Sequence, residues 1–282
     1  MKPKKILLFV FASAFFFSLT SCKKDTQKAT AAEIEATFDL TGKQAISDGL
    51  TEDANNILNE VAETQNLSGS REPLVCMGTT TCAQVSVSPG NFPKTITLDF
   101  GTSGCSNGSS SVVRRGIVRI LLTDSLRRFG SKTIMTFENY YVNNYKKEAD
   151  SITWTNTSSN GTRSWNRIVY NGKITAPDGR YWLHVSNKNI TQVAGVNTPR
   201  VLIDDAFSIT GTATITNSSG NTREAVIINP LHKQVICEHV DQGTIRYQGA
   251  NHFSILDFGN GTCDAIATIS IDGYTPRTIT LP

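Results

Sequence analysis

The chain lacks the short signatures that mark common hydrolases and metalloenzymes. GxSxG and HExxH are both absent, and Cys76 and Cys82 do not have CxxC spacing. The four histidines do not form an obvious catalytic pair, and we interpret each as a strand surface or packing residue. The sequence therefore predicts no enzyme activity and no cofactor, although a site assembled from distant loops stays open.

Beyond the N-terminus, long hydrophobic runs are also missing. Ile6 to Leu19 is an apolar run that follows Lys2, Lys4 and Lys5, and it is too short to cross a membrane comfortably. The next residues, Leu19-Thr20-Ser21-Cys22, resemble the lipobox of bacterial lipoproteins. This resemblance implies a signal peptide at residues 1–21, acyl chains such as palmitate on Cys22, and anchoring in the bacterial outer membrane. The periplasmic and the surface-exposed side both stay open.

Charge is scarce, and its small excess belongs to the signal peptide. Charged residues make up 18% of the chain, with 27 Lys and Arg against 24 Asp and Glu. Residues 1–21 hold three lysines and no acid, so their removal leaves 24 of each sign. A neutral mature protein gives no reason to expect nucleic acid as a partner. The lipid itself implies the membrane as a partner.

The sequence predicts one short helix near the N-terminus. Residues 22–45 are interpreted as a lipidated N-terminus and tether, because they are mostly polar and lack a sustained apolar period. In Ser47 to Gln65, apolar residues recur at spacings of three and four, which is typical of a helix with one apolar face. We expect this helix to pack on the sheet formed by the rest of residues 46–282.

From Cys82 to the end, the apolar period changes to two, as in Ile96, Leu98 and Phe100. Between these runs lie dipeptides suited to tight turns, including Asn171-Gly172, Asp178-Gly179 and Asp272-Gly273. No long helical pattern interrupts them, which disfavours parallel βαβ units. We predict an all-β protein with an antiparallel meander. A sandwich and a large open or barrel-like sheet are both compatible with the pattern.

The phrase LDFG…C occurs twice, as LDFGTSGC from Leu98 and as LDFGNGTC from Leu256, with five of eight positions identical. Each copy follows a strand that begins near another cysteine, 23 residues before Cys105 in one unit and 26 before Cys263 in the other. Each unit is therefore predicted to be a three-stranded meander. We predict the disulfides Cys82–Cys105 and Cys237–Cys263, which suit an exported protein.

These features together resemble a family of uncharacterised Bacteroidetes lipoproteins. The resemblance rests on the lipobox, the paired C…LDFG…C units, FENYYVN from Phe137 and CDAIATISIDG from Cys263. It implies the location and the fold and carries no enzyme activity. The expected pattern has one cysteine before the first LDFG, so the resemblance leaves Cys76 as the odd thiol.

The repeated phrase has a metal-site alternative. Asp257, Asn260 and Asp264 surround a Gly-rich turn and are oxygen ligands of the kind that suit calcium, although the DxDxDG spacing is absent. A kinase-type DFG loop is excluded, because the other kinase motifs are missing. The simpler interpretation is that the aspartate caps the turn, the phenylalanine packs, and the glycine supplies a positive φ.

Aromatic side chains suggest a binding hypothesis. Six candidates fall within a short part of the sequence: Tyr140, Tyr141, Tyr145, Trp154, Trp165 and Trp182. Rings on a β surface stack on sugars, but cross-strand packing explains the same pattern. We therefore expect a structural or binding module of the envelope with a glycan or protein partner. An envelope hydrolase is the alternative.

Overall fold

The computed structural model describes residues 29–69, 80, 82–106, 112–159, 161–198, 201–249 and 251–281. Within them lie one α-helix, α1 (Ala31–Thr64), and a 3-10 turn, η1 (Leu202–Asp204). The strands are β1 (Gln84–Val87), β2 (Lys94–Asp99), β3 (Arg114–Leu122), β4 (Lys132–Val142), β5 (Tyr145–Glu148), β6 (Ser151–Asn156), β7 (Ser164–Thr175), β8 (Tyr181–Ala194), β9 (Ala206–Asn217), β10 (Thr222–Gln234), β11 (Gln242–Gln248), β12 (Phe253–Asn260), β13 (Ile266–Ile271) and β14 (Arg277–Thr280).

All 14 strands belong to one sheet, and every pairing between neighbouring strands is antiparallel. The sheet runs from β1 to β14 almost in sequence order, with β6 beside the main path, paired to β4 and β7. This confirms the predicted antiparallel meander and decides between its two forms, because the strands make a single sheet and not a sandwich.

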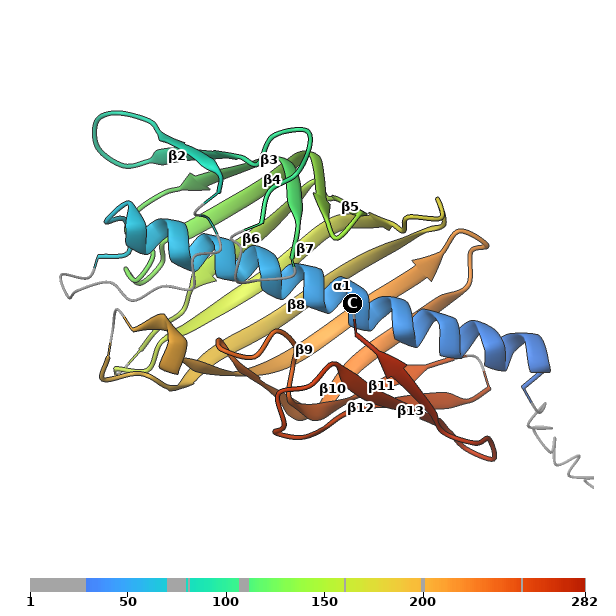
Figure 1. The fold of residues 1–282 in the computed structure, drawn as a ribbon. Helices are drawn as coiled ribbons and strands as arrows, with labels where there is room; N and C mark the ends of the chain where they lie inside the picture. Colours follow the sequence, from blue (N-terminus) through green and yellow to red (C-terminus); the bar gives the residue numbers. More distant parts are fainter. Residues whose placement is uncertain are drawn as a thin grey trace, which may run out of the picture.

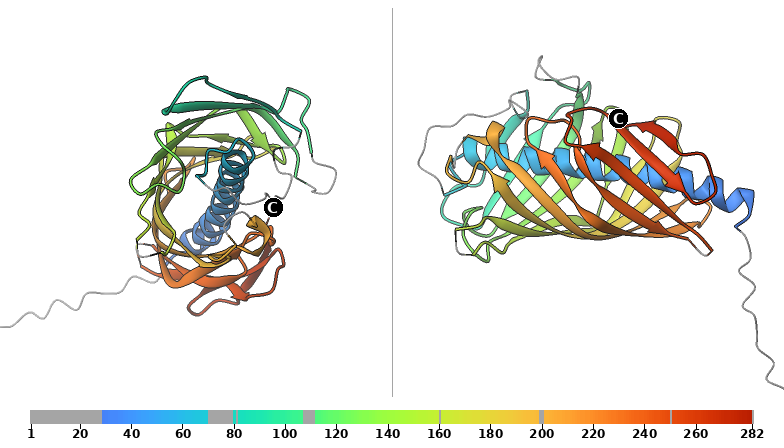
Figure 2. Two further views of the ribbon diagram at one scale, coloured as in Figure 1. Left: turned by 90° about the vertical axis from the view of Figure 1, so that its left-hand side faces the viewer. Right: turned by 90° about the horizontal axis from the view of Figure 1, so that it is seen from below.

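The sheet curls around α1, which lies along its concave side (Figure 1). Seen along the helix, strands surround α1 on most sides, while the sheet edges β1 and β14 do not pair with each other (Figure 2). The curvature lets one helix contact strands that are far apart in the chain. The apolar core therefore lies between the helix and the inner face of the sheet.

Local sequence sets both ends of α1. Thr30 caps the start, where its side chain accepts a hydrogen bond from Glu33 N at 3.2 Å. At the other end Asn66 adopts a positive φ of 56°, and Leu67 N donates to Ala62 O at 2.7 Å. Together with the bond from Asn66 N to Glu63 O, this is a Schellman motif, which satisfies carbonyls that the helix leaves free.

The helix is longer than the sequence indicates, because it begins at Ala31 and not near Ser47. The prediction of a tether over residues 22–45 is therefore wrong from Ala31 onward. The early half of α1 carries polar side chains that the sheet covers. Thr41 Oγ1, for example, lies 2.9 Å from Ser254 Oγ. Such polar residues interrupt the apolar stripe on which the prediction relied. They are tolerated at the interface because residues distant in the sequence pair their hydrogen-bonding groups.

One predicted turn is part of a strand. Asn171-Gly172 lies inside β7, where the pairing with β8 shifts register between Val169 and Gly172. Asn171 has a φ of 47°, and a Cβ on Gly172 would lie 2.5 Å from His184 Nε2. The dipeptide therefore forms a bulge that makes room for His184, whereas Asp178-Gly179 does form the turn from β7 to β8.

Candidate functional site

The interface between α1 and the sheet contains a row of buried ion pairs. Asp48 accepts from Lys188 Nζ at 2.5 Å, and Glu52 accepts from Arg167 Nη2 at 2.6 Å. The next residue of the helix, Asp53, pairs with Arg114, whose Nε lies 3.1 Å from Asp53 Oδ2. Each pair joins the helix to the sheet. Buried pairs of this kind fix the position of packed elements more than they add stability.

Two further buried bases face the helix without a carboxylate bonded to them. Lys147 Nζ donates to Leu50 O at 2.7 Å and to Thr51 Oγ1 at 3.2 Å. Burial is the largest influence on its pKa and lowers it to about 7. Burial likewise lowers the pKa of His184 to about 3, so this imidazole is neutral at physiological pH. Lys147 is bonded to the helix, and both side chains are buried away from solvent, which does not suit a reaction with a dissolved substrate.

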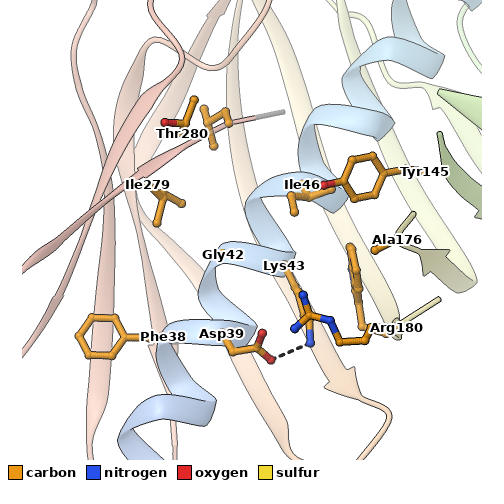
Figure 3. A pocket seen from close by; sticks show the side chains of 12 residues that line it. Phe38, Asp39, Gly42, Lys43, Ile46, Tyr145, Ala176, Arg180, Ile279 and Thr280 are labelled. Carbon is orange, nitrogen blue, oxygen red and sulfur yellow. Dashed lines mark hydrogen bonds and ion pairs between the residues drawn. The ribbon is translucent and has the colours of Figure 1, made fainter. Parts of the chain in front are cut away.

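An accessible cavity of about 270 Å³ lies beside the early half of α1 (Figure 3). Its lining comes from α1, from the start of β5, from the turn between β7 and β8, and from β14. We call it the α1–β14 pocket. Twelve residues line it: Phe38, Asp39, Gly42, Lys43, Ile46, Tyr145, Ala176, Arg180, Trp182, Ile279, Thr280 and Leu281. The curled sheet brings these segments together from opposite ends of the chain.

The walls of the pocket are mainly apolar. Trp182 is fully buried beneath it, and its Nε1–H donates to Ser47 Oγ at 2.8 Å, so the indole presents only carbon to this side. The Tyr145 ring meets Trp182 edge-on, with centroids 6.4 Å apart. Ile46 on the helix and Ile279 on β14 add aliphatic surface. Apolar walls with a few polar groups are typical of small-molecule sites.

The charged groups of the pocket lie together on one side. Lys43 Nζ donates to Asp39 Oδ2 at 2.7 Å and lies 5.7 Å from the centroid of the Trp182 ring. Arg180 uses Nε to bond Asp178 Oδ2 at 2.7 Å, while its two Nη atoms form no hydrogen bond with the described residues. Figure 3 shows the head groups of Lys43 and Arg180 next to each other. These donors are therefore available to an acceptor in the pocket.

Gly42 keeps the helical side of the pocket open. A Cβ at this position would meet no atom of the described residues within 4 Å, so Gly42 borders open space. Glycine inside a helix costs about 1 kcal/mol relative to alanine. An alanine would fit sterically, so packing alone does not explain the glycine.

The six aromatic candidates do not form one exposed surface. Tyr140, Trp154 and Trp182 are buried, and Tyr141 lies against Arg115, whose Cζ is 3.9 Å from the ring centroid. Trp165 packs on Phe207 at a centroid distance of 6.2 Å. The packing of these rings agrees with cross-strand packing, the other explanation of the pattern. Tyr145 and Trp182 nevertheless line the α1–β14 pocket.

The two LDFG phrases share the same local hydrogen bond, although the second copy lies at a register shift inside β12. Asp99 Oδ1 accepts from Gly101 N, and Asp257 Oδ1 accepts from Gly259 N, both at 2.8 Å. Both glycines have positive φ, and the phenylalanines, Phe100 and Phe258, are buried. This is the capped turn of the simpler interpretation.

The weak calcium candidates are engaged within their own loop. Besides Asp257, Asn260 Oδ1 accepts from Thr262 Oγ1 at 3.0 Å, and Asp264 Oδ1 accepts from Ile266 N at 2.9 Å. Among the described residues, the one metal-sized group of His, Cys, Asp and Glu atoms is Cys237, Asp241 and Cys263, whose two thiols are joined as a disulfide. This arrangement offers no calcium cage.

The structure contains both predicted cysteine pairs. Cys82 joins Cys105 and Cys237 joins Cys263, with Cα atoms 5.9 and 5.2 Å apart. Each bond connects the segment before the first strand of its unit to the loop after the second strand, as the repeat predicts. The lipidation residue Cys22 and the odd cysteine Cys76 lie outside the described residues.

The residues that complete the pocket were missed by sequence reasoning. Gly42 and Lys43 fell in the segment interpreted as a tether, and Ile279 lies on the last strand, more than 200 residues away. Besides the aromatic candidates Tyr145 and Trp182, the predicted turn at Asp178-Gly179, next to Arg180, gave a local signal. No sequence period relates a helix to a strand that meets it through the curvature of a sheet.

A curved antiparallel sheet around one helix, with a small pocket at their junction, defines the class of protein that the structure shows. No protein-family model, curated protein or solved structure matches the chain. In the described part of the chain, no helix has the length and apolar character needed to cross a bilayer. The pocket therefore provides the direct evidence on function.

Proposed function

We propose that this protein is a lipid-anchored binding module of the bacterial envelope and that the α1–β14 pocket is its ligand site. The pocket carries the proposal, because it combines a volume of about 270 Å³ with apolar walls and unengaged donors on one side. A dry cavity of about 150 Å³ holds benzene, and typical ligand sites begin near 300 Å³. The volume therefore suits a small molecule.

The proposed location rests on the sequence. The lipobox at Leu19 to Cys22 supports a lipid anchor, and the two cysteine pairs are consistent with an oxidising compartment. The resemblance to Bacteroidetes lipoproteins adds the outer membrane to this proposal. Binding is favoured over hydrolysis because the single carboxylate in the pocket lining, Asp39, is held by Lys43.

A matched pair of glycine variants tests the pocket. Gly42→Leu places a side chain in the pocket, whereas Gly49→Leu places one on the same helix at a position that does not line the pocket. We expect the full-length protein in lipid nanodiscs to bind small apolar compounds in a fragment screen by ligand-observed NMR. Gly42→Leu should weaken the hits at least tenfold, and Gly49→Leu should leave them unchanged.

Both variants improve helix propensity, so unequal folding does not explain a difference between them. Thermal unfolding of each variant supplies the control for the fold. A screen without any hit, or hits that Gly42→Leu leaves intact, would contradict the proposed function.

A further inference from the structure

We propose that the α1–β14 pocket selects a small hydrophobic carboxylic acid, with the apolar body inside and the carboxylate held by Lys43 and Arg180. This inference rests on the proposed function and adds the chemical class of the ligand. It follows from the size of the pocket, from the chemistry of its walls and from the direction of its free donors.

The walls argue for an apolar body. Ile46, Tyr145 and Ile279 present carbon, and the only indole N–H near the pocket is already bonded to Ser47. A sugar would lose hydrogen bonds from several hydroxyl groups on entering, because these walls offer few partners. A body of one or two rings, or a short branched chain, fits the volume without that cost.

The free donors argue for an anionic end. Asp178 accepts hydrogen bonds from both Arg180 N, at 3.0 Å, and Arg180 Nε, at 2.7 Å, which fixes the start of this side chain. Its two Nη atoms remain for another acceptor, and a planar guanidinium matches the two oxygens of a carboxylate. Lys43 Nζ carries three N–H groups and bonds one carboxylate oxygen of Asp39.

The selection for an anionic ligand comes from the directed donors of Lys43 and Arg180 and not from the net charge around the pocket. Lys43 and Arg180 balance Asp39 and Asp178, so the four side chains together are neutral. A cationic ligand would meet an ammonium and a guanidinium group and find the only carboxylate of the lining, Asp39, already bonded to Lys43. A neutral amide would offer one carbonyl oxygen to the Arg180 Nη groups and no negative charge. A carboxylate satisfies both cations at once.

A pair of probes that differ only in charge tests the inference. Naphthalene-2-acetate and its amide have nearly the same size and apolar surface. We expect the acid to bind the full-length protein in nanodiscs at least tenfold more tightly than the amide by calorimetry at neutral pH. Empty nanodiscs provide the blank for partition of either probe into lipid.

Arg180→Gln should remove most of this preference, by lowering the affinity for the acid much more than the affinity for the amide. Arg128→Gln is the matched control, because Arg128 is similarly exposed and pairs with Asp124 at 2.6 Å, far from the pocket lining. Since both arginines are about 70% exposed, neither substitution should affect folding.

The outcomes separate this inference from the proposed function. Equal binding of acid and amide, blocked by Gly42→Leu, would overturn the ligand class and leave the pocket as a binding site. An equal loss of the acid preference in Arg180→Gln and Arg128→Gln would also overturn it, because the effect would then be general electrostatics. Failure of both probes, with fragment hits still blocked by Gly42→Leu, would reject the hydrophobic acid and retain the pocket.

Discussion

Lys147 shows how burial changes the chemistry of a single residue in this protein. Its side chain is 1% exposed, and its ammonium meets Leu50 O and Thr51 Oγ1 in place of water. Burial lowers its pKa from 10.5 to about 7, even though Asp53 and Glu52 act in the opposite direction. The amine is therefore only partly protonated at neutral pH in the folded protein, and fully protonated after unfolding.

This difference predicts a pH dependence of stability. Between pH 7 and 10.5 the unfolded chain holds a proton on Lys147 that the folded chain has lost, so the free energy of unfolding rises with pH. The slope from this group is up to about 1.4 kcal/mol per pH unit. Below pH 7 both states are protonated, and the full cost of burying the charge is present.

Lys147→Met should remove this dependence. We expect the variant to be stabilised most at pH 6 and progressively less towards pH 10, because methionine carries no charge to bury. Urea unfolding of the wild type and the variant at pH 6, 8 and 10 measures the difference. Parallel stability curves for the two proteins would show that Lys147 does not titrate in this window.

At the scale of elements, the contact between α1 and β7 depends on Glu52 and Arg167. Arg167 is fully buried, and its Nε and Nη1 atoms find no hydrogen-bond partner among the described residues. Glu52 therefore compensates most of the buried positive charge of Arg167. Burial opposes ionisation of Glu52, but Arg167 outweighs it, and the pKa of Glu52 stays below its usual value. The carboxylate of Glu52 is therefore ionised in the folded protein at neutral pH.

Glu52→Gln should lower the free energy of unfolding by about 3–5 kcal/mol, because it leaves a buried guanidinium without a counter-charge. Glu35→Gln serves as the control. Glu35 also pairs with an arginine across two elements, Arg277, at 2.5 Å, but both side chains are largely exposed. Its loss should lower the free energy of unfolding far less, because solvent screens an exposed pair. Equal losses in denaturant unfolding would mean that the buried pair does not hold α1 in place.

The elements also show how far the sequence predicts the structure. Alternating residues such as Ile96 and Leu98 identify the strands, and the repeated LDFG turns follow from local hydrogen bonds of Asp99 and Asp257. The early half of α1 escapes prediction because its polar residues are satisfied across the interface. Thr37 Oγ1, for instance, accepts from Arg223 Nε at 2.8 Å, 186 residues away in the sequence.

At the scale of the whole molecule, curvature is the property that the sequence does not reveal. Strand patterns are alike in a sandwich and in an open sheet, since both place alternate residues inside. Which form results depends on what fills the concave side, here a helix whose length was not recognised. The pocket has the same origin, because Lys43 and Ile279 lie at opposite ends of the chain and meet only after the sheet curls.

Ligand binding in the α1–β14 pocket is the central claim, and the three tryptophans report on it directly. Trp182 lines this pocket, whereas Trp154 and Trp165 line a separate and much smaller cavity of about 10 Å³. A protein labelled with 5-fluorotryptophan should therefore give three ¹⁹F NMR signals, which variants such as Trp154→Phe and Trp165→Phe assign.

The decisive measurement is a titration of this labelled full-length protein with naphthalene-2-acetate in nanodiscs. We predict a saturable shift of the Trp182 signal, while the signals of Trp154 and Trp165 stay in place. A Trp182 signal that does not move at saturating probe, or three signals that move together, would contradict the claim that the pocket beside α1 binds a small hydrophobic acid.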